Sequence, residues 1–282
     1  MLSVAAWCVI AFAVLLALAY YVGPARWLDA AALHGFESVQ RPQVDSIATS
    51  LAHFCDPFPY ALVAMGVIAI AAKIRGLRVG AATGFLIVGA NASSQVLKPL
   101  LAHHRELSST EFHLININDA AFPSGHATAA MSLSLAVLMI VPRAYRPVVA
   151  VLGAIFTIAV SFAVLILGWH HPSDIVGGYL MATAWGLTTL AAYRYAGNRW
   201  PERGTMRVAA RNAIAAPSPA AIARTVVVLG ALACVVAASR AHQIAGYADR
   251  HTAMVAVASA IAVAAAVLLA AVASISSSRR SP

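Results

Sequence analysis

A succession of long apolar stretches limits the folds open to this chain more than any other feature of its sequence. About eight stretches approach the length that a helix needs to cross a bilayer. They are residues 2–22, 58–72, 79–98, 125–141, 148–168, 173–193, 220–239 and 251–274. Hydrophobic residues make up 61% of the sequence and charged residues only 10%, a balance that a water-soluble domain could not cover with polar surface. We therefore predict an all-α, polytopic membrane protein.

The distribution of charge predicts the orientation of these spans. The loops between them alternate between two sides, and one side carries most of the Lys and Arg residues, with Glu202 as its one acidic residue. By the positive-inside rule this side is cytoplasmic, and both termini lie on it. Every other acidic residue and all ten histidines fall on the outer side. Histidine has no known part in setting topology, so its one-sided distribution indicates that the chemistry is extracytoplasmic, at the cell membrane.

The same features divide the chain into three parts. Residues 1–197 form a transmembrane core, within which residues 25–57 are too polar to span and are predicted to form one or two helices on the outer membrane face. Residues 198–219 are basic and contain prolines, as expected of a cytoplasmic linker. Residues 220–282 form a two-helix extension, and residues 220–274 could contact a second copy of the chain or a membrane enzyme.

Composition also excludes some classes of protein. The basic residues lie in short clusters between apolar stretches rather than along one face, so a nucleic-acid partner is not expected despite the net charge of +9. Cys8, Cys55 and Cys234 do not have the spacing of metal ligands, and neither a disulfide framework nor a metal site is predicted.

The first polar cluster lies at the end of the third apolar stretch. Asn91, Gln95 and Lys98 recur at helical spacing and form a polar stripe, which in a membrane helix usually faces other helices or a wet cavity. Pro99 disfavours α geometry at Lys98 and predicts a bend or an exit from the helix there. Arg105 follows Lys98 by about two helical turns, so the two cations share a side if the helix resumes. Such a pair suits a phosphate.

The second cluster is the run from Phe122 to His126, which leads directly into an apolar stretch. Pro123, Ser124 and Gly125 are typical of a capped helix N-terminus with free N–H groups, which attracts anions. His126 falls in the first turn. An ordinary capped helix with an incidental histidine explains this run equally well.

The third cluster places His170 and Asp174 four residues apart between two apolar stretches. Ionisable groups beside hydrocarbon are costly unless they have a partner or a task. Asp174 also has a simpler explanation as an acidic residue in the first turn of a helix. Gly177 and Gly178 permit close helix packing.

Together the three clusters resemble the motifs of the type 2 phosphatidic acid phosphatase (PAP2) superfamily of membrane lipid phosphatases. That family's pattern is K-x6-R-P, P-S-G-H and S-R-x5-H-x3-D, and the chain matches it in order and spacing over about residues 58–195. Glu106 stands where the family usually has proline. Ala163 and Val164 replace the serine and arginine of the third motif, so the family's third phosphate-binding cation is absent there.

The resemblance implies a six-helix core, extended here by two C-terminal helices, and a two-step displacement without metal or cofactor. His170 would be the nucleophile, Asp174 its orienting carboxylate, and His126 the acid and base. The implied phosphate-binding groups are Lys98, Arg105 and the backbone N–H groups of Ser124 and Gly125. A protonated histidine could replace the missing arginine, and the candidates in the same outer layer are His103, His104 and His171.

Two classes of function remain open. The first is an extracytoplasmic phosphatase acting on a lipid phosphate or diphosphate, with phosphatidic acid, phosphatidylglycerol phosphate and polyprenyl phosphates all suitable. The second is a weak or inactive relative that binds a lipid headgroup or scaffolds a membrane enzyme. A transporter is disfavoured, because the polar residues gather on one face and no inverted repeat is present.

Overall fold

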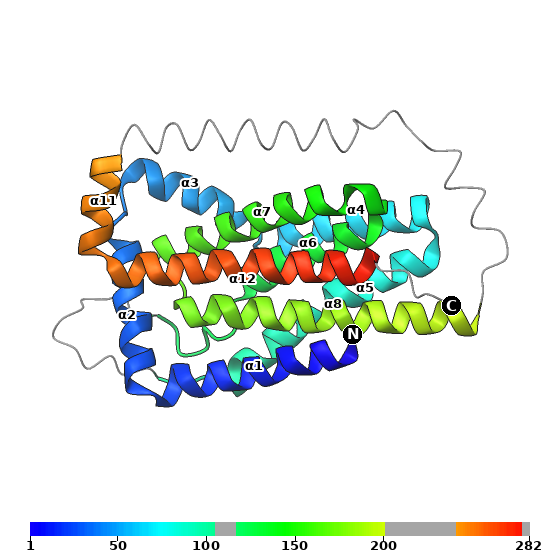
Figure 1. The fold of residues 1–282 in the computed structure, drawn as a ribbon, viewed down its shortest axis with the longest axis horizontal. Helices are drawn as coiled ribbons and strands as arrows, with labels where there is room; N and C mark the ends of the chain where they lie inside the picture. The colour runs from blue at the N-terminus through cyan, green and yellow to red at the C-terminus, as the bar shows by residue number, and fades with distance from the viewer. Residues whose placement is uncertain (105–116, 201–240, 278–282) are drawn as a thin grey trace.

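Every regular element that the structure describes is a helix. The structure is a computed structural model, which describes residues 1–104, 117–200 and 241–277. In chain order the elements are α1 (Leu2–Tyr21), α2 (Gly23–Glu37), α3 (Pro42–His53), α4 (Pro57–Arg75), α5 (Leu77–Leu100), α6 (Gly125–Ile140), the 3-10 helix η1 (Arg143–Tyr145), α7 (Arg146–Ile166), α8 (Pro172–Arg199), α11 (Ala241–Arg250) and α12 (Thr252–Ser277). The long helices run side by side, and α2 and α11 lie at one end of this bundle (Figure 1). The all-α prediction is confirmed.

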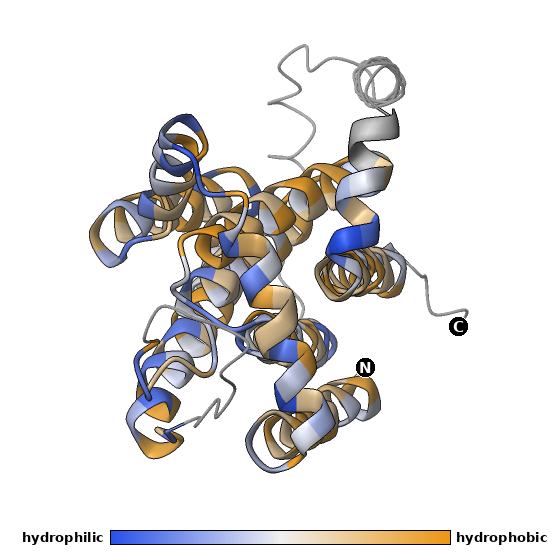
Figure 2. Cartoon of the chain, turned by 90° about the vertical axis from the view of Figure 1, so that its left-hand side faces the viewer, coloured by the Kyte–Doolittle hydropathy of each residue, from blue (hydrophilic) through white to orange (hydrophobic). Residues whose placement is uncertain are grey.

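Several of these helices are suited to a membrane. By length and hydropathy α1, α4, α7 with η1, α8 and α12 could each cross it, whereas α6 is apolar but has only 16 residues. α5 is not among them, and it carries the polar stripe of Asn91, Gln95 and Lys98. Viewed along the bundle, hydrophilic residues gather in the loops and short helices nearest the viewer, and the long helices are largely hydrophobic (Figure 2). These are the features of a multi-pass membrane protein. The expected span at residues 220–239 lies outside the described residues.

The polar segment 25–57 forms two helices, as its pattern predicts. α2 has Pro24 in its first turn, and α3 begins at Pro42. Proline fits the first turn of a helix, because the N–H that it lacks would have no partner there. α2 contacts α12 and α7, and α3 contacts α7.

One local boundary differs from the prediction. α5 does not end at Lys98 but continues through Pro99 to Leu100, since the Leu101 N–H still donates to the Leu97 carbonyl, at 2.8 Å. Residues 101–104 are not helical, so the helix does not resume directly after α5.

α6 lies at the centre of the bundle, with α5, α7 and α8 packed around it. Most of its residues are buried, and many are alanine or serine, whose small side chains let neighbouring helices approach closely. Its buried hydroxyls have partners: Ser132 Oγ lies 2.9 Å from Tyr60 Oη, and Ser134 Oγ lies 3.2 Å from Thr157 Oγ1.

α12 packs against α7, α2 and α8 and is joined to the core by two arginines. Arg146 donates to the Ser276 carbonyl at 2.6 Å, and Arg194 to the Ile275 carbonyl at 2.8 Å. Cations stabilise a helix C-terminus, where carbonyls lack partners within the helix. These contacts fix one end of α12. The expected contact with a partner through residues 220–274 remains a proposal, for which exposed Val255, Val263 and Val267 offer an apolar face.

Candidate active site

The turn between α7 and α8 determines where His170 lies. Gly168 has a positive φ of 67°, a conformation that glycine adopts without steric cost. Its N–H donates to the Leu165 carbonyl at 3.0 Å, and the Trp169 N–H donates to the Val164 carbonyl at 2.9 Å. This is the Schellman pattern of a helix end. This turn terminates α7 and places His170 just before the start of α8.

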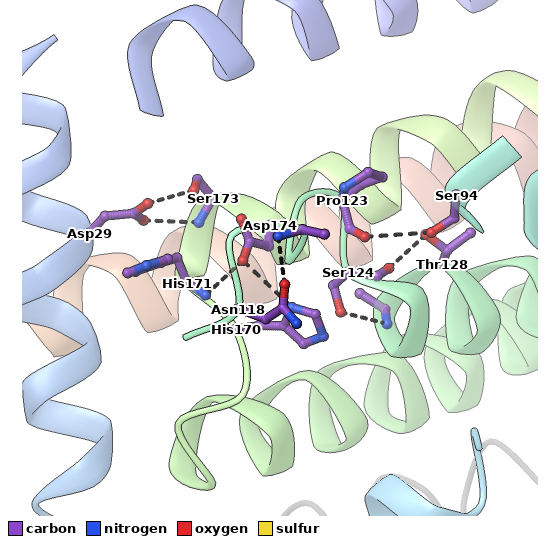
Figure 3. A network of polar contacts seen from close by, with 12 residues as sticks. Asp29, Ser94, Asn118, Pro123, Ser124, Thr128, His170, His171, Ser173 and Asp174 are labelled. Carbon is purple, nitrogen blue, oxygen red and sulfur yellow. Dashed lines mark hydrogen bonds and ion pairs between the residues drawn. The ribbon is translucent and has the colours of Figure 1, made fainter. Parts of the chain in front are cut away.

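His170 and Asp174 form a buried pair at that start. Nδ1 of His170 lies 3.5 Å from Oδ2 of Asp174, and the two side chains are 7% and 0% exposed. The same Oδ2 accepts the backbone N–H of His171 at 2.9 Å (Figure 3). The 3.5 Å separation is long for a hydrogen bond, as is common in sites that tighten when substrate binds. The backbone therefore holds Asp174 in place beside His170.

The N-terminus of α6 forms the second part of the site. The Ser124 hydroxyl accepts the Ala127 N–H at 3.3 Å, and the Ser124 carbonyl accepts the Thr128 hydroxyl at 2.7 Å (Figure 3). Gly125 and His126 follow in the first turn. The Ser124 N–H donates to the Asp174 carbonyl at 2.9 Å, so it is occupied by the chain itself. Of the two N–H groups expected to bind phosphate, we therefore retain only that of Gly125 in the proposed site.

Close packing of α8 on α6 brings the two histidines together. A Cβ on Gly178 would lie 2.8 Å from the Ser124 carbonyl oxygen, and one on Gly177 would lie 2.8 Å from the Phe122 ring. Such distances leave no room for a side chain, which confirms the packing role expected for these glycines. The rings of His126 and His170 are consequently 6.0 Å apart, centroid to centroid.

Lys98 lies at the same helix N-terminus, carried there by α5. A Cβ on Gly125 would be 3.5 Å from Nζ of Lys98 and 3.4 Å from the Gln95 side-chain nitrogen. Both residues line a cavity of about 680 Å³ together with Asn91 and His126. The rest of its wall is mainly apolar and is formed by α4 and α5, with Ala61, Ala64, Met65, Ile68 and Val88. The cavity thus has a polar part that contains Lys98 and a larger apolar part.

A second carboxylate, not anticipated from the sequence, lies on the other side of His126. Asp56 precedes α4, and its Oδ1 is 3.2 Å from Nε2 of His126. Its Oδ2 is 2.5 Å from Nδ1 of His53. Asp56 is 33% exposed, and the side chain of His126 is 19% exposed. The sequence contains no motif for this contact, because 70 residues separate Asp56 from His126.

The surroundings of Asp56 affect two pKa values. Partial burial opposes ionisation of Asp56, but the hydrogen bonds from His53 and His126 outweigh it and lower the pKa of this carboxyl. Burial, with a smaller contribution from the Asp56 charge, raises the pKa of the neighbouring Cys55 thiol to about 12. At neutral pH Asp56 is therefore an anion and Cys55 a neutral thiol.

The three histidines considered as substitutes for the missing arginine contact residues outside the cavity wall. The His103 ring stacks on Tyr20, with centroids 4.9 Å apart, and Nδ1 of His104 lies 2.9 Å from Asp119. His171 is buried as the residue before α8. None of the three lines the cavity. Their proposed accessory role consequently has no geometric support in the described part of the chain.

Val164 is fully buried in the core, and Ala163 is 3% exposed. Neither position presents a polar side chain to the site. Arg105, the other expected phosphate ligand, lies outside the described residues. Among the described residues that line the cavity, Lys98 is the one cation.

In the described ranges, no group of three or more His, Cys, Asp or Glu side chains is arranged to hold a metal ion. The site itself offers two imidazoles, each beside a carboxylate, with a lysine and a helix N-terminus close to one of them.

Comparison with known proteins relates the chain to one family model and to one solved fold. Residues 79–199 match the family model described as the PAP2 superfamily. The chain is also similar to the crystal structure of a transmembrane PAP2-type phosphatidylglycerolphosphate phosphatase from Bacillus subtilis, with a TM-score of 0.56 and 16% identity over 71% of this chain and 98% of that one. At this identity the likeness concerns the fold. No curated protein sequence matched.

Proposed function

We propose that this chain, a multi-pass membrane protein whose residues 79–199 match the PAP2 superfamily model, is a lipid phosphatase that acts through a phosphohistidine. One observation carries the proposal. Lys98, Gly125 and His126 line the polar part of a mainly apolar cavity, and the His126 ring is 6.0 Å from that of His170. A lipid phosphate presents the same two parts, an anion and a hydrocarbon tail.

In the first step His170 attacks phosphorus and the bond from phosphorus to the lipid oxygen breaks. The ring needs a free electron pair on one nitrogen, and Asp174 next to Nδ1 favours the tautomer that leaves this pair on Nε2. Protonated His126 gives its proton to the departing oxygen. The products of this step are the dephosphorylated lipid and phosphohistidine at His170.

In the second step water attacks the phosphorus, and neutral His126 accepts one of its protons. The bond from phosphorus to nitrogen breaks and inorganic phosphate leaves. Lys98 and the Gly125 N–H stabilise the negative charge that develops on the phosphoryl oxygens in both steps. His126 ends the cycle protonated, ready for the next substrate.

The cavity supports a substrate with a long apolar chain. Its wall between α4 and α5 consists mainly of Ala, Ile, Met and Val side chains, which favour burial of hydrocarbon. Phosphatidic acid, phosphatidylglycerol phosphate and polyprenyl phosphates or diphosphates all combine such a chain with a terminal phosphate. The name of the Bacillus subtilis protein makes phosphatidylglycerol phosphate a natural member of the first panel.

We place the site on the extracytoplasmic side of the cell membrane. Lys73 and Arg75 end α4, and Arg194 and Arg199 lie in the last turns of α8, whereas His126 and His170 lie where α6 and α8 begin. The basic end faces the cytoplasm by the positive-inside rule.

Val164 motivates a second candidate, a catalytically weak relative that binds a lipid headgroup. Loss of one arginine from a phosphoryl-transfer site can reduce the rate by a factor of about 10³ to 10⁵. Lys98 is the one cation among the described residues of the cavity wall, so this reduction is a realistic outcome.

Purified protein incubated with the lipid phosphates named above separates the two functions. We expect phosphate release from at least one of them, and none above background from His170→Ala protein that retains its fold. If the wild-type and variant proteins release phosphate equally slowly from every substrate, the headgroup-binding function is favoured. Trapping the ³²P-labelled protein by rapid acid quench and mapping the label to His170 tests the covalent intermediate.

A further inference from the structure

The contact between Asp56 and His126 indicates a role for a residue that lies outside the segment matched by the family model. An aspartate that precedes a helix normally accepts an N–H from the first turn of that helix. Asp56 makes no such bond to α4. Pro57 and Pro59 remove N–H groups from that turn, and the carboxylate is directed instead to His53, three residues earlier, and to His126 of α6.

The geometry of these contacts is that of an orienting carboxylate. Oδ1 of Asp56 lies 3.2 Å from Nε2 of His126. Because an ionised carboxylate can only accept, this contact assigns the proton to Nε2. The other nitrogen of His126, Nδ1, is then the one that exchanges a proton with substrate oxygen or water. Oδ2 is 2.5 Å from His53, which limits rotation of the carboxylate.

We propose that Asp56 is the positioning residue of His126 and that His53 holds Asp56 in the required orientation. This inference rests on the proposed phosphatase function. Asp56 fixes the tautomer and ring orientation of His126 and stabilises the imidazolium that must donate the proton to the leaving oxygen. It touches neither substrate nor the reacting atoms, so its effect is transmitted through His126.

Other charged groups also act on His126. The His126 ring is 6.0 Å from that of His170, Lys98 lines the same cavity wall, and Asp174 lies beyond His170. Lys98 and a protonated His170 disfavour the imidazolium, whereas the two carboxylates favour it. Asp56 is the carboxylate in direct contact. Its pKa is lowered by the bonds from His53 and His126, so it remains ionised over the working range of an acid–base histidine.

The test uses the full-length protein in detergent micelles with the fastest substrate of the panel. We expect Asp56→Asn to reduce kcat by about 10- to 100-fold, with KM changed less than about threefold, because general acid–base catalysis is impaired and binding is not. Asp56→Glu, which keeps the charge, should recover part of the loss. The limb of the kcat–pH profile assigned to the general acid should move to lower pH in Asp56→Asn.

Asp119→Asn is the matched control, since Asp119 pairs with exposed His104 at 2.9 Å away from the cavity wall. It should leave kcat and the pH profile unchanged. A purely structural role for Asp56 would lower the thermal midpoint and the active fraction without moving the pH profile of the remaining activity. That result, or an unchanged kcat in Asp56→Asn, would overturn the proposal.

A readout without turnover keeps this inference separate from the proposed function. Carbethoxylation of His126 by diethyl pyrocarbonate, followed by mass spectrometry across pH, reports the fraction of neutral imidazole. The midpoint should fall in Asp56→Asn and stay constant in Asp119→Asn. If no substrate is hydrolysed, the proposed function fails. A shifted midpoint of His126 carbethoxylation would still support the proposal that Asp56 positions His126. An unshifted midpoint overturns it.

Discussion

The two histidine–carboxylate pairs of the site differ in how the chain builds them. His170 and Asp174 are four residues apart, and the carboxylate is fully buried and bound to the backbone N–H of His171. His126 and Asp56 are 70 residues apart, and the carboxylate is one-third exposed and bound to a second side chain, His53. The first pair follows from one turn and one helix start. The second exists only because α4 packs beside α6.

The difference suggests a division of labour between the two pairs. A nucleophile needs a fixed tautomer, and a rigid backbone contact provides it. An acid that also acts as a base must change protonation state in each cycle, and a partly exposed carboxylate partner restricts that change less than a buried one. The proposed mechanism requires both properties in one site.

The largest expected effect comes from removing the proposed nucleophile. His170→Ala should lower kcat by about 10³-fold or more, since no other imidazole of the described residues is held in the same position. His251→Ala is the control, because this histidine lies between α11 and α12, with its ring 4.3 Å from that of Tyr247, and its loss should leave the rate unchanged. Phosphate release measures both. A His170→Ala protein with more than about a tenth of wild-type activity contradicts the proposed nucleophile.

Removing the two carboxylate charges separately tests the difference between the two histidine–carboxylate pairs. Asp174→Asn should reduce kcat by about 10²- to 10⁴-fold, as expected when the carboxylate beside a catalytic histidine is lost. The effect should exceed that of Asp56→Asn, because Asp174 is fully buried beside His170. Thermal unfolding of both variants separates loss of activity from loss of fold. Equal effects of the two substitutions would remove the distinction drawn between the pairs.

The contact that brings the pairs together should be sensitive to small changes. Gly178→Val places a side chain against the Ser124 carbonyl and should destabilise the protein by about 1–3 kcal/mol while separating His126 from His170. Gly66→Ala in α4, where a Cβ meets nothing within 4 Å, is the control and should be neutral or slightly stabilising. Thermal unfolding and phosphate release measure the two effects. A Gly178→Val protein as stable and active as the control contradicts the proposed packing.

The smallest expected effect is the dependence of stability on acid pH. The pKa of Asp56 is lowered in the folded protein, so its contribution is present above the pKa of an unfolded aspartate, about 3.9, and is lost as pH falls through the lower folded value. The thermal midpoint of the wild type should therefore fall more steeply below about pH 4 than that of Asp56→Asn. Solvent screening keeps this difference small, because Asp56 is one-third exposed. Parallel curves for the two proteins would contradict the assigned direction.

Particular residues show which structural features could be predicted from the sequence and which could not. The apolar stretches predicted the helices, because burial in a membrane needs long runs that are visible in the chain itself. The exit from α5 was expected at Lys98 but falls after Leu100, since a proline near the end of a helix can be accommodated when the surrounding hydrogen bonds are kept. The Ser124 N–H was assigned to phosphate, whereas Asp174 of another helix uses it. That error could not have been avoided, because it depends on the packing of α8 against α6.

The sequence by itself determined the features that are local along the chain: the helical class, the cap at Ser124, and the four-residue step from His170 to Asp174. Each depends on backbone geometry within one or two turns, which residue type and spacing define. Only the tertiary structure decided which groups meet across helices: Lys98 with Gly125, His126 with His170, and Asp56 with His126. Those meetings depend on the fit of one helix surface to another, and no single segment encodes that fit.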